Sequence, residues 1–298
     1  MKIVVTGGSG RVGRYVVDEV SREHQVTVFD QVAPKADVQF VQGDITDPEA
    51  CRSAFRGADA VLHLAAIPHP LTEAPSRIMQ VNVVGTYCVL DACAEMGVRR
   101  LVMASTDSVY GFFFQRDFTG ASPSGTAFAP GPARPERLPI DEKHPARAHD
   151  PYGLSKILCE RAAESYSRAM RLNVICLRLM GVWTPDFYPV ARAILGNAEL
   201  GGRSLWTYSD PRDVAQAFRL AAEAERVEPF DVMLVAPADA ATPLDVRELV
   251  AKYYPNVEVT APLSRDSSLY DCSRAAQMLG YSPKYSWRDL PEFADLAR

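Results

Sequence analysis

The chain has 298 residues, of which 47% are hydrophobic and 23% charged, and it carries a formal net charge of −5. This length is sufficient to bury a large core and a second lobe, so we expect a globular protein. Because no segment carries a sustained basic block, we expect neither nucleic acid nor an anionic membrane surface as a partner.

The sequence indicates neither a membrane span nor a metal site. No run of about 18 apolar residues occurs, and the apolar run after Lys2 is shorter than that of a signal peptide, so we expect a cytoplasmic protein. The cysteines lie in apolar segments without Cys-x-x-Cys spacing, which predicts buried thiols and no metal site. They are Cys51, Cys88, Cys93, Cys159, Cys176 and Cys272.

Short apolar runs alternate with helical patterns along most of the chain. Strands are predicted at 2–6, 25–30, 38–42, 60–64, 100–104, 173–177 and 231–235. Helices are predicted to begin near 12 and to cover about 48–55, 75–96, 152–170, 187–195, 210–224, 244–253 and 273–279. This alternation predicts an α/β fold with a doubly wound parallel sheet of the Rossmann type.

The order of the elements predicts two interleaved parts. We expect a dinucleotide-binding domain at 1–178 plus about 205–236, and a smaller C-terminal substrate lobe at about 179–204 plus 237–298. The segment 111–150 interrupts the pattern with six prolines. It connects the predicted strand 100–104 to the predicted helix 152–170, and it is interpreted either as a flap over a substrate or as a flexible excursion.

A glycine-rich turn follows the first predicted strand and opens a helix, in the sequence Thr-Gly-Gly-Ser-Gly-Arg-Val-Gly. In this context Gly7 permits a tight turn, Gly10 lets the backbone approach a pyrophosphate, and Gly13 allows close packing of helix on strand. Arg11 and Val12 lie between these glycines, and the phosphates would lie at the positive end of the helix. The turn therefore predicts a dinucleotide site.

Asp30 ends the second predicted strand and bears on which dinucleotide is bound. A carboxylate at this position accepts hydrogen bonds from a ribose 2′-hydroxyl and repels a 2′-phosphate, so NAD is favoured. NADP is the less favoured alternative, because the guanidinium of Arg11 can pair with its 2′-phosphate.

Tyr152 and Lys156 stand four positions apart, which places them on one face of a predicted helix. A neighbouring ammonium favours the phenolate, so Tyr152 is a candidate acid/base near neutral pH. Together with the glycine-rich turn, this pair predicts hydride transfer with proton exchange at a substrate oxygen.

Several motifs resemble the extended short-chain dehydrogenase/reductase superfamily, in its NAD-dependent epimerase/dehydratase branch, and the resemblance covers essentially the whole chain. The motifs are the turn above, Gly43-Asp44-Ile45, His63-Leu64-Ala65-Ala66, Asn82 in a predicted helix, the segment Met103 to Gly111, and Tyr152-Gly-Leu-Ser-Lys156. The resemblance implies that Asp44 and Ile45 meet the adenine, that Leu64, Ala65 and Ala66 lie beneath the cofactor, and that Asn82 and Lys156 contribute to its site. It also implies that Thr106 is the catalytic hydroxyl, with Ser105 and Ser108 as alternates.

The resemblance implies less about the substrate, for which we expect contacts from Ser105, Thr106, Asp107, Arg178 and Trp206. Gly181 stands where the 4-epimerases have an asparagine that contacts the diphosphate, and Trp206 stands where an arginine commonly binds it; Arg203 could substitute. Arg178 resembles the arginine that holds a substrate carboxylate in uronate dehydrogenases, although a structural ion pair is also open. These positions favour a sugar or sugar acid over a nucleotide-sugar.

The expected function is that of an NAD-dependent enzyme acting at a carbinol carbon of a sugar or sugar derivative, by net dehydrogenation or by epimerisation. A UDP-sugar 4-epimerase is the alternative, and a non-catalytic nucleotide-sensing regulator is a remote one. A homodimer is expected through the helices near 75–96 and 152–170, with Leu158, Cys159 and Ala162 as candidates for its apolar face.

Overall fold

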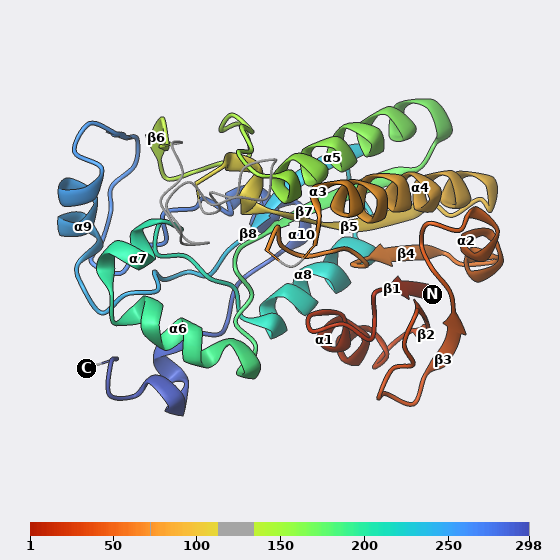
Figure 1. Ribbon diagram of the computed structural model, residues 1–298, viewed down its shortest axis with the longest axis horizontal. Helices are drawn as coiled ribbons and strands as arrows, with labels where there is room; N and C mark the ends of the chain where they lie inside the picture. The colour runs from red at the N-terminus through yellow and green to blue at the C-terminus, as the bar shows by residue number, and fades with distance from the viewer. Residues whose placement is uncertain (72, 113–133, 298) are drawn as a thin grey trace.

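The computed structural model describes residues 1–71, 73–112 and 134–297. Its centre is a seven-stranded parallel sheet with the strand order β3-β2-β1-β4-β5-β7-β8 (Figure 1). The strands are β1 Lys2–Thr6, β2 Gln25–Asp30, β3 Gln39–Gln42, β4 Ala60–His63, β5 Arg100–Thr106, β7 Asn173–Leu179 and β8 Phe230–Val235. The expected doubly wound α/β fold is confirmed.

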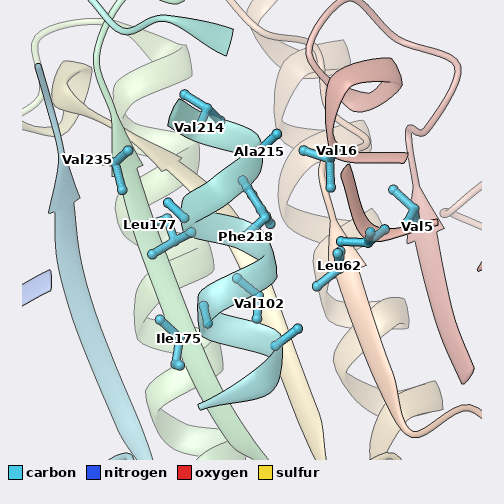
Figure 2. Packing of buried hydrophobic residues seen from close by; sticks show 14 of the residues in the cluster. Val5, Val16, Leu62, Val102, Ile175, Leu177, Val214, Ala215, Phe218 and Val235 are labelled. Atoms are coloured by element: carbon cyan, nitrogen blue, oxygen red, sulfur yellow. The ribbon is translucent and has the colours of Figure 1, made fainter. Parts of the chain in front are cut away.

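Helices cover both faces of this sheet, which explains why its strands are apolar on both sides. One face carries α1 Gly13–Val20, α8 Pro211–Glu223 and α10 Ser273–Leu279. In the core of this face, Val16 of α1 and Phe218 of α8 pack toward Val5, Leu62 and the neighbouring strands (Figure 2). The opposite face carries α2 Pro48–Phe55, α4 Gly85–Glu95 and α5 Pro151–Met170.

The helix predicted at 75–96 is divided into three pieces. α3 Pro75–Ile78 is followed by the π-helix η1 Met79–Val84 and then by α4. A π-helical turn shifts the register of the residues that follow, and such turns occur often at functional sites. Here the turn contains Asn82, which is buried.

The sequence at residues 150 and 151 sets the start of helix α5. The Asp150 carboxylate accepts a hydrogen bond from the Gly153 amide at 2.9 Å, and Pro151 occupies the first turn. An aspartate cap followed by proline is a strong start signal. The cap fixes the register in which α5 presents Tyr152 and Lys156.

The remaining elements lie outside the seven-stranded sheet, and all but the first two named below fall within 179–204 and 237–298, the segments predicted as a substrate lobe. They are η2 Asp107–Tyr110, β6 Arg137–Leu138, η3 Pro185–Phe187, α6 Tyr188–Leu195, α7 Ala198–Gly202, α9 Val246–Tyr253, β9 Glu258–Val259, η4 Trp287–Asp289 and η5 Pro291–Phe293. Two apolar clusters outside the sheet hold these elements together, one around Trp206 and one around Trp287. The exact division into domains stays a prediction.

The segment 111–150, interpreted from the sequence as a flap or a flexible excursion, is described by the structure only in part. Residues 113–133 lie outside the described part of the chain, whereas 134–150 are packed. Strand β6 pairs with β9, Ile140 bridges Tyr270, and Leu138 and Ile140 are buried. The second half of this segment is thus built into the smaller lobe rather than being structureless.

Candidate active site

A cavity of about 460 Å³ lies at the carboxyl ends of the central strands. Ligands of open parallel sheets bind at this edge, outside the strand ends. The lining comes from the glycine-rich turn, from the loop after β4, from β5, α5 and the end of β7, and from residues of the segments 180–194 and 204–207. Predicted site residues in the lining are Gly7, Gly10, Arg11, Val12, Gly13, Leu64, Ala66, Ser105, Thr106, Asp107, Tyr152 and Lys156.

The glycine-rich turn leaves no room for side chains at two of its positions. Gly7 has φ +71°, and a Cβ there would lie 2.5 Å from the Ala65 amide nitrogen. A Cβ on Gly13 would overlap the carbonyl oxygen of Gly7. Gly10 lines the cavity, and its amide donates to the Gly7 carbonyl at 3.0 Å. The turn is therefore a backbone cradle, which suits a pyrophosphate at the start of α1.

Two predicted adenosine contacts lie on loops beyond this cradle. Asp30 accepts a hydrogen bond from the Ser9 amide at 3.0 Å, so the carboxylate that closes β2 also holds the glycine-rich turn. Asp44 accepts hydrogen bonds from the amide and hydroxyl of Thr46, both at 2.8 Å. The Ile45 side chain is buried against Gly85, which leaves only its backbone for a cofactor contact.

A buried chain of polar groups runs from β1 to α4 beneath the cavity. The His63 ring lies 2.7 Å from the Thr6 hydroxyl and 3.0 Å from the Thr86 hydroxyl. Burial, together with the charge of Lys156, lowers the pKa of His63 to about 3, so the ring is neutral at physiological pH. This chain fixes the strand end that leads into Leu64, Ala65 and Ala66.

Asn82 is buried in the π-helix and links three segments. Its amide oxygen accepts from the Ile67 amide at 2.8 Å, and its nitrogen donates to the Ile67 carbonyl at 3.1 Å and to the Ser155 hydroxyl at 3.0 Å. The side chain thus ties the loop after β4 to helix α5. Its polar groups are engaged within the protein, so its role is to position the cavity walls.

Tyr152 and Thr106 face the same cavity from α5 and from the end of β5. Burial raises the pKa of the Tyr152 phenol, and a hydrogen bond with Thr106 lowers it in part. The negative charge of Asp107 contributes to the increase. In the free protein Tyr152 is therefore a protonated phenol beside a second hydroxyl, an arrangement that can hold one substrate oxygen.

Lys156 lies one turn further along α5, with its ammonium 6.0 Å from the centre of the Tyr152 ring. The ammonium donates to the Ala104 carbonyl at 2.9 Å. Burial lowers the pKa of Lys156, since it disfavours the charged form. The lysine is thus held at the floor of the cavity, between the end of β5 and the tyrosine.

The neighbours of Thr106 have different surroundings. The Ser105 hydroxyl donates to the Glu160 carboxylate at 2.6 Å, so it lines the cavity while serving an internal bond. The Ser108 hydroxyl accepts from Thr106 at 3.2 Å. Burial raises the pKa of Asp107 to about 7, and this carboxyl group lines the cavity directly beside Thr106.

Arg178 does not lie where a substrate-binding arginine is expected. It is absent from the described lining, and its guanidinium makes two hydrogen bonds to Glu160, at 2.9 and 2.8 Å, and one to the Tyr110 hydroxyl, at 2.9 Å. The side chains of Arg178 and Glu160 are only 7% and 8% exposed. A bidentate pair of this kind engages both edges of the carboxylate. The guanidinium of Arg178 therefore forms a structural ion pair with Glu160 instead of the expected contact with a substrate carboxylate.

Trp206 likewise belongs to the core of the smaller lobe. It is fully buried, its indole nitrogen donates to the Ala198 carbonyl at 2.9 Å, and its ring packs on Gly201 and Gly202. Its backbone lies in the left-handed region, with φ +49°. The expected substrate contact from Trp206 is therefore not made by its side chain in the described structure.

The cavity includes residues to which sequence reasoning gave no role. They are Pro68, His69, Leu71, Ala104, Leu179, Met180, Val182, Trp183, Phe187, Ile194, Ser204 and Thr207. The rule that ligands bind outside the carboxyl ends of strands points to the residues after β7. Thr207 belongs to this lining, whereas its neighbour Trp206 is buried in the smaller lobe and does not.

The fold and the site together define a dinucleotide-binding α/β enzyme with a tyrosine–lysine pair. The cradle of Gly7, Gly10 and Gly13 suits a dinucleotide, because all three glycines line the cavity and the backbone packs too closely at Gly7 and Gly13 for any Cβ atom. No group of three or more potential metal-ligating side chains occurs among the described residues, and no helix in that part of the chain is long and apolar enough to cross a membrane.

Comparisons with known proteins agree with this class. The model of the NAD dependent epimerase/dehydratase family matches residues 3–236. The L-arabinose 1-dehydrogenase (NAD(P)(+)) of Haloferax volcanii is 31% identical over 244 residues, covering 80% of this chain and 89% of its own. The UDP-glucose 4-epimerase of Streptomyces lividans is 31% identical over 193 residues, covering 61% of this chain and 52% of its own.

A solved short-chain dehydrogenase/reductase superfamily protein from Agrobacterium tumefaciens, with bound NAD, superposes with a TM-score of 0.72 at 24% identity. The match covers 100% of this chain and 96% of that one, and it shows a shared fold. The chain belongs to the NAD-dependent epimerase/dehydratase family. The resemblance drawn from the sequence, the enzyme class and NAD as the cofactor are thereby confirmed.

Proposed function

We propose that this enzyme acts on a carbinol carbon of a sugar or sugar derivative that carries no nucleotide. The observation that supports this most directly is that Tyr152 and Thr106 present their hydroxyls to the same cavity as the glycine-rich turn. NAD, when bound, supplies the hydride acceptor for such a reaction. The Haloferax relative, which covers most of this chain, is named for a free sugar.

In this proposal each side chain has one task. Thr106 and Tyr152 hold the substrate oxygen. After the phenol of Tyr152 has released its own proton to solvent, the phenolate accepts the proton of the hydroxyl as the carbon is oxidised; in the reverse direction the protonated phenol donates to the carbonyl oxygen. Lys156 lowers the cost of the phenolate and orients the nicotinamide ribose. Asn82 fixes the loop after β4, so the cavity keeps its shape. Epimerisation needs the same groups, with the hydride returned to the same molecule.

The test is a screen of free aldoses, uronic acids and UDP-sugars with NAD⁺, followed by Tyr152→Phe with the best substrate. The variant should lower kcat by about 100-fold or more, a typical share for a positioned acid/base, with NAD⁺ affinity nearly unchanged by calorimetry. Tyr166→Phe is the matched control, since Tyr166 lies on the same helix with its hydroxyl bonded to Asp91 and lines no part of the described cavity.

Near wild-type turnover in Tyr152→Phe would refute the assignment. Tight NAD⁺ binding without turnover of any sugar would favour the regulator. Conversion of UDP-glucose to UDP-galactose without net NADH release would favour the 4-epimerase, a function that the name of the Streptomyces relative suggests.

The proposal extends to assembly and compartment. Two copies would pair through α4 and α5, where Tyr87 and Leu158 are 54% and 41% exposed. Cys159 does not contribute to this face, because it is buried and its thiol donates to the Asn82 carbonyl. A cytoplasmic location agrees with the six cysteines, which are all free thiols.

A further inference from the structure

We infer that the carboxyl group of Asp107 accepts the proton that leaves Tyr152, with the Thr106 hydroxyl between them. The inference rests on the proposed function and adds to it the route by which this proton leaves the site. It is supported by the hydrogen bonds around Thr106, by the charges around the carboxyl group, and by the position of Asp107 in the cavity wall.

A chain of three polar groups joins the start of α5 to the residue after β5. The Tyr152 phenol forms a hydrogen bond with the Thr106 hydroxyl, and this hydroxyl donates to a carboxylate oxygen of Asp107 at 3.2 Å. The Thr106 hydroxyl also lies 3.2 Å from that of Ser108, but an aliphatic hydroxyl does not retain an added proton near neutral pH. Asp107 is therefore the member of this chain that can take up a proton.

The surroundings of Asp107 suit a group that gains and loses a proton near neutral pH. Burial raises its pKa to about 7, and the hydrogen bond from Thr106 offsets this increase in part. The charge of Asp150, in the cap of α5, adds to the increase. Its other titratable neighbours are Tyr152 and Tyr270, whose pKa values the charge of Asp107 raises. A pKa near the working pH is what an acid/base group in catalysis needs.

The repulsion between Asp107 and Tyr152 favours one negative charge at this site at a time. A carboxylate beside the phenol disfavours the phenolate, which is why the charge of Asp107 raises the pKa of Tyr152. When the carboxylate takes up the proton that the phenol has lost, the phenolate lies beside a neutral carboxyl group and the repulsion is removed. Two groups coupled in this way titrate as a pair.

Asp107 can also pass the proton on, because its side chain lines the cavity and is only half-buried. In oxidation, the Tyr152 proton moves to Thr106 while the Thr106 proton moves to Asp107, which releases it to water in the cavity. The phenolate then accepts the hydroxyl proton of the substrate as the carbon gives up its hydride. One proton and one hydride thus leave the substrate, and reduction of a carbonyl uses the same steps in reverse.

The test is the pH dependence of kcat/KM for oxidation of the best sugar at saturating NAD⁺. In the wild-type enzyme kcat/KM should fall about tenfold per pH unit below about pH 7, where Asp107 is protonated, and should level off above it. Asp107→Asn keeps an oxygen that accepts from Thr106 but cannot take up a proton. Its kcat/KM should be about tenfold lower or less at pH 7, with the rise displaced by about one unit or more to alkaline pH.

Two further variants separate proton transfer from a structural role. Asp150→Asn is the matched control, because Asp150 also has a raised pKa, lies outside the described lining, and can be replaced as a helix cap by asparagine. The rise near pH 7 should remain in this variant. In Asp107→Ala, added formate should restore part of kcat/KM in proportion to its concentration, since it replaces the missing carboxylate.

A rise near pH 7 that persists in Asp107→Asn overturns the inference, as does a loss of activity in Asp107→Ala that formate does not restore. If Tyr152→Phe is inactive in the same assays, the proposed function then stands without this role for Asp107. Wild-type activity in Tyr152→Phe would instead refute the proposed function itself.

Discussion

The pairing of Arg178 with Glu160 determines the role of this arginine beside the active site. Arg178 ends β7 beside the active site, where its position alone suits a substrate carboxylate. The bidentate bond to Glu160, together with the bond to Tyr110, uses the guanidinium inside the protein. Glu160 also accepts from Ser105, so this pair supports the strand end that carries Thr106. Arg178 therefore stabilises the end of the strand that carries Thr106.

The pair predicts a large loss of stability when one partner is changed. Glu160→Gln leaves the Arg178 charge buried without compensation, and the free energy of unfolding in urea should fall by about 3–5 kcal/mol. Glu164→Gln is the control on the same helix, because Glu164 pairs with the exposed Arg161 and Arg168 and its loss should cost about 0–1 kcal/mol. If Glu160→Gln kept wild-type stability but lost affinity for uronates, Arg178 would be a substrate group after all.

At the scale of elements, the first strand, turn and helix form the most tightly constrained unit of the site. Gly13 begins α1 so close to the turn that the helix and the carbonyl of Gly7 are in contact. This closeness brings the amino end of α1 toward the cradle. Any side chain at this position has to push the helix away from the strand.

Gly13→Ala should therefore weaken NAD⁺ binding by more than tenfold and lower stability by about 1–3 kcal/mol, as overpacking does. Calorimetric titration and thermal unfolding measure the two effects. Gly196→Ala is the matched control, because a Cβ there would be exposed and would meet only ordinary contacts. Unchanged NAD⁺ affinity in Gly13→Ala would show that the start of α1 is not part of the cofactor site.

These elements also show what sequence can predict. The strands, the glycine-rich turn and the spacing of Tyr152 and Lys156 depend on local rules, and the elements lie where expected within a few residues. The partner of Arg178 could not be predicted, because it is set by how α5 packs beside β7. The burial of Trp206 in the smaller lobe could not be predicted either, since Leu205 and Trp206 both have a positive φ, which no propensity indicates for these residue types. The π-helical turn at Asn82 could not be predicted either, because the sequence at 75–96 shows one continuous helical pattern.

At the scale of the whole molecule, the outer surfaces of α4 and α5 carry the apolar side chains that a dimer would cover. Tyr87 and Leu158 are exposed there, as is Val84 at the end of η1, and Tyr87 packs edge-on against Tyr166 across the two helices. An exposed apolar group of this kind is a common mark of a protein–protein interface. The face lies away from the cavity, so pairing would leave the site open.

Leu158→Glu should convert the dimer to a monomer in sedimentation velocity measurements, because it places a charge in the core of the proposed interface. Val190→Glu is the control, since Val190 is exposed to a similar extent, 40% against 41%, on helix α6. Both variants should keep the wild-type Tm of the monomer fold. A wild-type protein that sediments as a monomer at all concentrations would refute the dimer.

The packed half of the connection from β5 to α5 has a mechanical consequence. Residues 134–150 add a strand to β9 and a bridge at Tyr270, and then lead directly into the cap of α5. The smaller lobe is thus linked through a short segment to Tyr152, the residue for which we propose proton transfer. Because the segment is short, we expect a displacement of β9 or of the chain near Tyr270 to reach the start of α5, which would couple the binding of a substrate to the alignment of Tyr152.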